Sequence, residues 1–290
     1  MPIITLPRLL LSLFSWLLLA AAVFLFWRWY DGYLVQRITG EFYRERGPFW
    51  MLVAASVIAL LCLFGRIPIG FLIAKAGPRS DTKRRDGSQV VAPDGSKLFV
   101  ETSGVLSAPT VILTHGWGLN ATAWGLTRLA LEKEYRVVAW DLPGLGRSSG
   151  PSDGKYSLDR FAEALAAVVE MSSAERVLLV GHSIGGMTSQ TFFRVAARAS
   201  LDKIAGVALF DTTYLNPMQT MIGAKLWLSL RKVLIEPICW LSIFLWPFAW
   251  LSAWQGYLNG TSHLVMRFTG FGGGATRPLV DLTARLSAKG

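Results

Sequence analysis

A serine with glycines two positions before and two positions after it is the residue of this chain best suited to nucleophilic chemistry. Ser183 lies in Gly-His-Ser-Ile-Gly at residues 181–185, after the apolar run VLLV and before a segment with helical periodicity. In a sharp turn from strand to helix, small residues at these two positions relieve crowding, and the tip of the turn exposes the hydroxyl. The N-terminus of the new helix directs backbone N–H groups at a developing oxyanion. The spacing therefore predicts Ser183 as a nucleophile that attacks a carbonyl carbon.

A second glycine turn could complete an oxyanion site. His-Gly-Trp-Gly, residues 115–118, follows the apolar run TVILT. Its glycines allow the backbone to approach a substrate carbonyl, so we expect the N–H of Trp117 to act together with the N–H of Ile184. A plain structural turn is the alternative. A third turn, DLPGLGRSS at residues 141–149, contains Pro143, Gly144 and Gly146 and ends another apolar run.

The elements that must position these turns alternate along the chain. β-Branched and leucine-rich runs occupy residues 110–116, 136–144, 176–183 and 204–213. Between them, segments such as 158–171 repeat apolar residues at helical spacing. Strands that alternate with helices predict right-handed crossovers and a parallel sheet covered on both faces, which is an α/β fold. Residues 90–102, with Pro-Asp-Gly-Ser between two apolar runs, predict a hairpin ahead of this sheet.

The three turns together resemble a known superfamily. HGWG, DLPGLGRSS and GHSIGG, in this order and spacing, look like the α/β-hydrolase superfamily, and specifically its single-domain hydrolases with a helical cap, over residues 90–290. The resemblance implies an α/β-hydrolase core. A serine at position 183 argues against haloalkane dehalogenases and epoxide hydrolases, whose nucleophile is an aspartate. It suits esterases, lipases, thioesterases, C–C hydrolases and cofactor-free haloperoxidases.

The resemblance also implies an acid and then a histidine after later strands, in the chain order Ser, Asp, His. His115 belongs to the oxyanion turn and His182 to the nucleophile turn, which leaves His263 as a candidate base without a strand before it. Asp211 ends the fourth strand and is the candidate acid, while a second aspartate, Asp281, lies in a helix-like tail. Three explanations stay open, in this order: a fragment of a longer hydrolase, a degenerate relative, or an unusual triad of Ser183 with Asp211 and His263.

The N-terminal region predicts a membrane anchor. Residues 9–27 carry no charge and are long enough to cross a bilayer core of about 30 Å. Residues 49–65 form a second, shorter uncharged run. A cleaved signal peptide is the rival interpretation of the first run, and a buried core helix that of the second. We expect a transmembrane helical hairpin, with more basic residues on the two outer flanks than in the loop, which places the hydrolase domain in the cytoplasm.

Charge and cysteine content restrict the partners. The net charge is +10, but the basic residues gather around the apolar runs, where they suit anionic lipid headgroups, and no nucleic-acid motif accompanies them. Cys62 and Cys239 are the only cysteines and imply no disulfide framework. No metal-ligand cluster or dinucleotide fingerprint occurs, so we expect no cofactor. The expected partners are the lipid bilayer and a small apolar ester-like substrate.

The predicted organisation has four parts: an anchor at residues 1–75, a linker at 76–89, the α/β-hydrolase core at 90–213 and a helical, tryptophan-rich cap region at 214–290. Within the last part, residues 238–254 are uncharged and hold Trp240, Trp246, Trp250 and Trp254. A third transmembrane span and a buried cap helix are two interpretations of this run. We favour a lid at the membrane surface, where indole rings prefer headgroup depth.

The prediction for function is a membrane-anchored serine hydrolase that forms an acyl-enzyme on Ser183 with an ester, thioester or lipid-like substrate. The alternative is a catalytically inactive membrane protein that uses the hydrolase fold for binding. A serine without a base retains only the contribution of the oxyanion hole and of binding to the rate.

Overall fold

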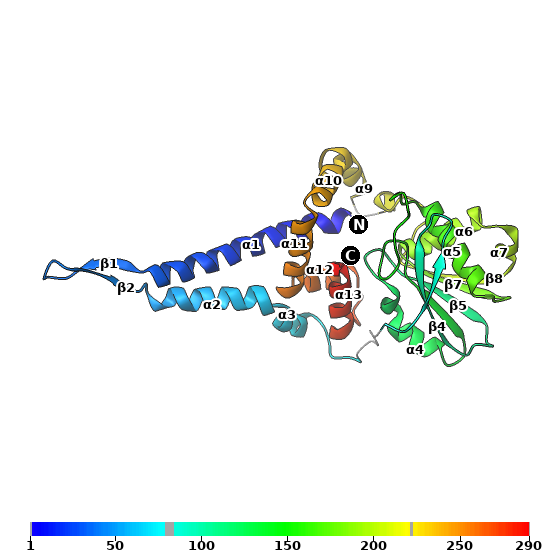
Figure 1. The fold of residues 1–290 in the computed structure, drawn as a ribbon, viewed down its shortest axis with the longest axis horizontal. Coiled ribbons are helices and arrows are strands. Elements are labelled where there is room, and N and C mark those ends of the chain that lie inside the picture. Colours follow the sequence, from blue (N-terminus) through cyan, green and yellow to red (C-terminus); the bar gives the residue numbers. More distant parts are fainter. Residues whose placement is uncertain (1, 79–83, 221–222, 290) are drawn as a thin grey trace. The chain divides into compact units, whose positions relative to one another are not determined.

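The computed structural model describes residues 2–78, 84–220 and 223–289. These residues form two compact units. The first unit joins the N-terminal residues up to Pro78 with residues 230–289. The second unit contains the described residues between 84 and 229. Each unit is described by itself below (Figure 1).

The second unit is built on a six-stranded mixed sheet. Its strands are β3 (Ser88–Val91), β4 (Lys97–Gly104), β5 (Thr110–Thr114), β6 (Arg136–Trp140), β7 (Val177–His182) and β8 (Ile204–Phe210), in the order β3-β4-β6-β5-β7-β8. Strands β6, β5, β7 and β8 are mutually parallel, whereas β3 and β4 run antiparallel to their neighbours. The four predicted strands and the predicted hairpin are therefore confirmed, and the hairpin extends the parallel sheet into a mixed one.

The hairpin turn shows why the sequence folds in this way locally. The carboxylate of Asp94 accepts a hydrogen bond from the backbone N–H of Ser96 at 2.9 Å, and Gly95 adopts a φ of +83° that suits glycine. Strand β3 begins at Ser88, so the last two residues of the predicted linker belong to the sheet. Residues 79–83 of the predicted linker lie outside the described residues.

Alternate side chains of the strands enter two apolar clusters on opposite faces of the sheet, as the period of two requires. On β5, Ile112 packs with the helix α5 (Leu158–Met171), while Val111 and Leu113 pack with the turn η1 (Ala121–Trp124) and with Leu131 at the end of α4 (Gly125–Leu131). Helix α6 (Ile184–Val195) joins α5 on its face, and the short α7 (Arg198–Asp202) precedes β8. Figure 1 shows α5 and α6 side by side.

Strand β8 is an edge strand of this sheet, and little of the described chain covers it. Val207, Leu209 and Phe210 remain exposed, although the residues of β7 that pair with them are buried or half-buried. An uncovered parallel edge strand presents unpaired backbone groups to its surroundings. After β8 the chain continues into α8 (Pro217–Thr220) and α9 (Ala224–Leu230).

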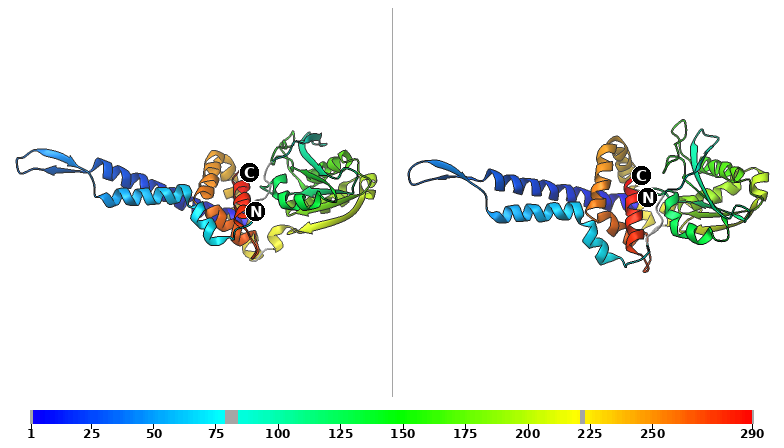
Figure 2. Two further views of the ribbon diagram at one scale, coloured as in Figure 1. Left: turned by 90° about the horizontal axis from the view of Figure 1, so that it is seen from below. Right: turned by 60° about the horizontal axis from the view of Figure 1, so that its bottom comes forward.

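The first unit begins with two helices joined by a β-hairpin. Helix α1 (Pro2–Asp31) leads to β1 (Tyr33–Gln36) and β2 (Phe42–Glu45), followed by α2 (Phe49–Phe64) and α3 (Arg66–Ile73). Figures 1 and 2 show α1 and α2 side by side, with the β-hairpin at one end of the pair. Residues Leu11–Asp31 of α1 are long and apolar enough to cross a membrane.

The second predicted span, residues 49–65, corresponds to α2, which is too short by itself to be a candidate span. The chain bends by 62° between α2 and α3, and the two helices count as a span only if the bent pair is taken as one. The break falls at Gly65, where a Cβ atom would lie 2.6 Å from the backbone oxygen of Asn259. Helix α2 alone, with 16 residues, measures about 24 Å, short of a bilayer core. The transmembrane hairpin stays a prediction beyond its first helix.

The C-terminal helices belong to the same unit as the N-terminal ones. They are η2 (Arg231–Ile235, a π-helix), α10 (Glu236–Phe244), α11 (Trp246–Leu258), α12 (Thr261–Thr269) and α13 (Arg277–Lys289). Buried polar contacts hold α11 against α1 and α2: Gln255 donates from Nε2 to Ser15 Oγ at 2.9 Å and to the backbone oxygen of Cys62 at 3.2 Å. The sequence predicted residues 214–290 as one cap region, whereas the boundary between the two units falls at residue 230. Partners so far apart in the chain leave no local sequence signal.

The tryptophan-rich segment is broken, as its prolines predicted. Helices Ala224–Phe244 and Trp246–Leu258 meet at an angle of 99°, and Pro247 occupies the first turn of α11. Trp240, Trp246 and Trp250 are exposed, whereas Trp254 is half-buried against Tyr257. The three interpretations of this segment stay open.

Candidate active site

Ser183 occupies the tip of the turn between β7 and α6. Its backbone has φ 54° and ψ −120°, a region that residues with a Cβ rarely adopt outside strained functional turns. The turn is fixed on both sides. The N–H of Ser183 donates to the backbone oxygen of Phe210 at 3.0 Å, and the Oγ1 of Thr212 donates to the oxygen of Ser183 at 2.7 Å. The end of β8 thus holds the conformation that the sequence predicted for the serine.

The glycines of the motif are required by close approach of the backbone. A Cβ at Gly181 would lie 2.6 Å from the oxygen of Gly185, and a Cβ at Gly185 would lie 2.4 Å from the oxygen of Thr114. A Cβ at Gly116 would lie 3.3 Å from the Cβ of Ser183. The turn after β5 therefore lies directly beside the serine.

Two backbone N–H groups near Ser183 are available to a ligand. Ile184 is the first residue of α6, where N–H groups have no partner within the helix. Trp117 follows Gly116, and among the hydrogen bonds of residues 84–220 its N–H donates to no backbone oxygen. The side chain of Trp117 is exposed, and that of Ser183 is partly exposed. This arrangement can accommodate an oxyanion formed at a carbonyl attacked by Ser183.

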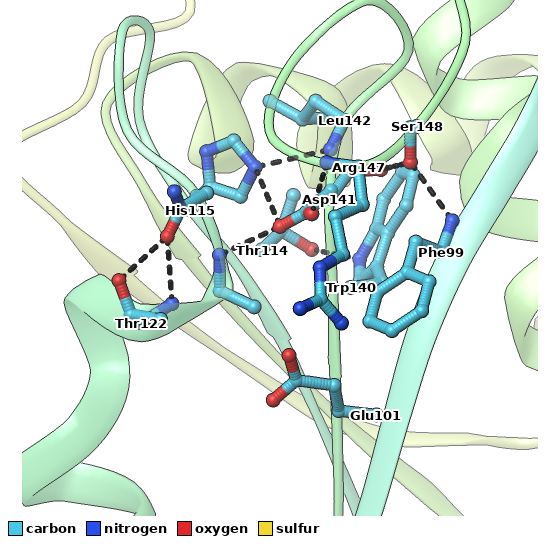
Figure 3. Close-up of polar contacts among 12 residues, drawn as sticks. Phe99, Glu101, Thr114, His115, Thr122, Trp140, Asp141, Leu142, Arg147 and Ser148 are labelled. Carbon is cyan, nitrogen blue, oxygen red and sulfur yellow. Dashed lines mark hydrogen bonds and ion pairs between the residues drawn. The ribbon is translucent and has the colours of Figure 1, made fainter. Parts of the chain in front are cut away.

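The turn that carries Trp117 is held by a buried histidine and a buried aspartate (Figure 3). His115 contacts the oxygen of Gly116 through Nδ1 at 2.8 Å, and its Nε2 accepts the N–H of Leu142 at 3.0 Å. The carboxylate of Asp141 accepts the N–H of Ala121 at 2.8 Å and that of Arg147 at 2.8 Å. The loops after β5 and β6 are thereby tied to one another. Burial lowers the pKa of His115, with the proton on Nδ1 as its partners require.

Two arginines neutralise the carboxylates beneath these loops. Arg84 forms ion pairs with Asp141 and, from Nε to Oε1 at 3.1 Å, with Glu101. Arg128 of α4 pairs with the other oxygen of Glu101, and both of these residues are 0% exposed. This network of Arg84, Glu101, Arg128 and Asp141 was not anticipated from sequence. The one available signal was an aspartate directly after a strand, at Asp141.

Neither nearby histidine serves Ser183 as a base. The two ring nitrogens of His115 are occupied as described. The ring of His182 lies against Gly116, where a Cβ would be 2.7 Å from its Nδ1, and burial lowers the pKa of His182 while the charge of Asp211 raises it in part. Within residues 84–220, no hydrogen bond joins the hydroxyl of Ser183 to another side chain.

The candidate acid and base lie in different units. Asp211 directly follows β8, with a positive φ of 46° and an exposed side chain. His263 lies in α12 of the first unit, where it is buried and its Nε2 contacts Oδ1 of Asp281 at 3.0 Å. Tyr257 donates to the same oxygen at 3.0 Å. His263 therefore already has a carboxylate partner, and its pairing with Asp211 stays a prediction.

Metal chemistry has no ligand set in the described part of the chain: no group of three or more His, Cys, Asp or Glu side chains converges there.

Parts of the chain are similar to known proteins. Residues 109–231 match the family model for the alpha/beta hydrolase fold. The chain is 40% identical over 98 residues to the bifunctional esterase/perhydrolase DCH of Acinetobacter calcoaceticus, covering 33% of this chain and 35% of that protein. It is 35% identical over 121 residues to a non-heme chloroperoxidase of Streptomyces lividans, covering 41% of this chain and 42% of that protein.

Solved structures include an esterase from a Rhodococcus species, which is 26% identical, with a TM-score of 0.40 over 44% of this chain and 46% of that one. The matched segment thus spans well under half the length of these relatives.

Proposed function

We propose, from the premise that residues 109–231 place the chain in the α/β-hydrolase superfamily, that it is a serine hydrolase whose nucleophile is Ser183. The observation that carries the proposal is the strained φ of 54° at Ser183, held between β7 and α6 beside Gly116. A polar residue in such a conformation at the edge of a parallel sheet is typical of a reacting group. The activities of the relatives, esterase and perhydrolase among them, support carbonyl chemistry.

The proposed reaction is acyl transfer. The Oγ of Ser183 attacks the carbonyl carbon of an ester, thioester or lipid-like substrate as a base takes its proton. The N–H groups of Trp117 and Ile184 stabilise the oxyanion, and collapse of the intermediate expels the alcohol or thiol and leaves an acyl-enzyme. Water then attacks the acyl carbon as the base takes a proton from it. The bond from the acyl carbon to Oγ breaks, the carboxylic acid leaves, and Oγ of Ser183 takes the proton back from the base.

The base is the open part of this proposal. His263 is the candidate within the chain, predicted from the sequence together with Asp211, and it contacts the carboxylate of Asp281 in its own unit. The other candidate is a histidine in sequence that continues beyond residue 290. Among residues 84–220 no side chain hydrogen-bonds the hydroxyl of Ser183, which favours a second function, a non-catalytic binding protein; the experiment below separates the two.

Hydrolysis of p-nitrophenyl esters of increasing chain length by the longest natural form of the protein tests the proposal. Ser183→Ala should lower kcat by about three orders of magnitude or more, as loss of a nucleophile does, with KM little changed. Ser152→Ala, which alters an exposed serine bonded only to Asp94, should retain activity. His263→Asn should match Ser183→Ala if His263 is the base. Equal rates in Ser183→Ala and the unaltered protein would support the binding function instead.

Membrane attachment through α1 is also proposed. Its support is the uncharged run and the exposure of large apolar side chains such as Leu17, Val23 and Phe24 along the helix, which water would not favour. The proposed location of the hydrolase unit is the cytoplasmic side, from the distribution of basic residues.

A further inference from the structure

The first unit contains a cavity of about 420 Å³ beside the C-terminal end of α3. Three cationic side chains line it, those of Lys75, Arg267 and Arg277, and none of its lining residues is acidic. Within the described residues, none of the three forms an ion pair with a carboxylate. Three like charges around one cavity repel one another, so the arrangement favours an anion between them.

The chain holds the two arginines in place without neutralising them. Arg267 donates from Nε to the oxygen of Ile73 at 3.0 Å and from NH1 to the oxygen of Phe271 at 3.3 Å, and its second terminal nitrogen has no hydrogen-bond partner among the described residues. The guanidinium of Arg277 lies 3.9 Å from the centre of the Phe71 ring, and its backbone N–H donates to the oxygen of Lys75 at 2.8 Å. Guanidinium groups fixed in this way are suited to phosphate oxygens.

An apolar surface adjoins the basic cavity. Phe71 and Leu72 line the cavity and belong to α3, yet they are 67% and 84% exposed. A free inorganic phosphate would use the cations and leave these side chains in water. An amphiphile would use both, with its phosphate among the cations and its acyl chains along α3.

The glycine segment at the cavity leaves space beside it. Gly273 lines the cavity, and a Cβ at this position would meet nothing within 4 Å. The backbone at Gly273 therefore does not close this side against a group bulkier than a phosphate ion, such as a phosphoglycerol headgroup.

We infer that this cavity binds the headgroup of an anionic phospholipid, with Lys75, Arg267 and Arg277 as the phosphate ligands. The inference rests on the proposed membrane association of the first unit and is independent of the chemistry at Ser183. The bound lipid would fix the end of α3 at the membrane surface.

The test uses the full chain in neutral detergent, titrated with fluorescently labelled dioleoyl phosphatidylglycerol or phosphatidylcholine and followed by anisotropy. Phosphatidylglycerol should bind at least about tenfold more tightly, and Lys75→Gln with Arg277→Gln should abolish that preference. Arg37→Gln with Lys289→Gln removes the same charge from exposed positions outside the cavity and should keep the preference.

A second pair of variants leaves the three cations untouched. Gly273→Asp places a carboxylate at the open side and should weaken phosphatidylglycerol binding, whereas Gly273→Ala makes the same backbone change without charge and should not. Equal affinity for the two lipids, equal loss in both double variants, or displacement of the lipid by inorganic phosphate at an equal concentration would overturn the inference. Flotation of the chain with phosphatidylcholine liposomes reports membrane association separately, and Ser183→Ala should leave lipid binding unchanged.

Discussion

The Nε2 atom of His115 accepts a hydrogen bond from the backbone N–H of Leu142 at 3.0 Å, which joins the loop after β5 to the loop after β6. A protonated imidazole has no acceptor nitrogen, so this bond exists only while His115 is neutral. The turn that presents Trp117 beside Ser183 therefore depends on an uncharged histidine.

Acidification should loosen this junction. Burial lowers the pKa of His115 below its ordinary value of 6.5, so below that pH the unfolded chain binds a proton that the folded chain does not. The contribution of His115 to stability is complete above pH 6.5 and is lost as the pH falls toward the folded-state pKa. Hydrogen exchange of peptides that contain Leu142, corrected for intrinsic rates, should accelerate over this range. In His115→Gln, whose amide oxygen does not titrate, the acceleration should be weaker, and an identical pH profile would contradict the role assigned to His115.

Glu101→Gln should destabilise the second unit strongly. The change leaves Arg84 and Arg128 without their shared countercharge in a buried site, which costs about 3–5 kcal/mol of the free energy of unfolding. Urea unfolding of the full chain in neutral detergent measures the loss. The matched control is Asp159→Asn, which breaks a pair with Arg194 whose side chains are 50% and 67% exposed, and it should cost less than about 1 kcal/mol. Similar losses in the two variants would show that the buried network does not stabilise the unit.

Gly185→Ala should disrupt the nucleophile turn. The new methyl group would lie 2.4 Å from the oxygen of Thr114 and 2.7 Å from that of His115, both backbone atoms that cannot move aside cheaply. We expect a loss of about 1–3 kcal/mol in the free energy of unfolding, together with lower reactivity of Ser183. Gly206→Ala is the control in β8, where only the flexible end of Leu178 lies close, at 3.2 Å. The prediction fails if both alanines are tolerated equally.

Parts of this site could be read from sequence because they depend on neighbours along the chain. The turn at Ser183 follows from glycines two residues away on each side, and the hairpin follows from Pro-Asp-Gly-Ser after Ala92. The network around Asp141 could not be read in this way, since Glu101 and Arg128 are 27 residues apart and meet only in the folded sheet. The same holds for His263 and Asp281, which lie on different helices.

The assignment of residues 230–289 to the first unit shows the same limit. Apolar composition predicted helices there, and the break at Pro247 followed from the proline. The partners of these helices did not follow, because the contacts of Gln255 with Ser15 and Cys62 join residues 240 and 193 positions apart. Composition predicts that a face will be buried without identifying what buries it.

Trp246→Ser with Trp250→Ser should reduce contact with lipid. Their side chains are 66% and 49% exposed on α11, and indole rings favour the headgroup region of a bilayer. Quenching of tryptophan fluorescence by brominated lipid, measured with the full chain in liposomes, should fall in the double variant. Trp140→Phe, which removes a buried core tryptophan bonded to Thr114, should leave the quenched amplitude unchanged. Unaltered quenching in the double variant would mean that these two rings do not face lipid.

The central claim is that Ser183 is an activated nucleophile, and a fluorophosphonate probe tests it most directly. The longest natural form of the protein is labelled and digested with trypsin, and the peptide of residues 177–194 is sequenced by mass spectrometry. That peptide also contains Ser189, whose buried hydroxyl donates to the oxygen of Gly185 and serves as an internal control. The account predicts one phosphonyl adduct, on Ser183, abolished in Ser183→Ala and retained in Ser189→Ala. A peptide that carries no adduct on Ser183 would contradict it.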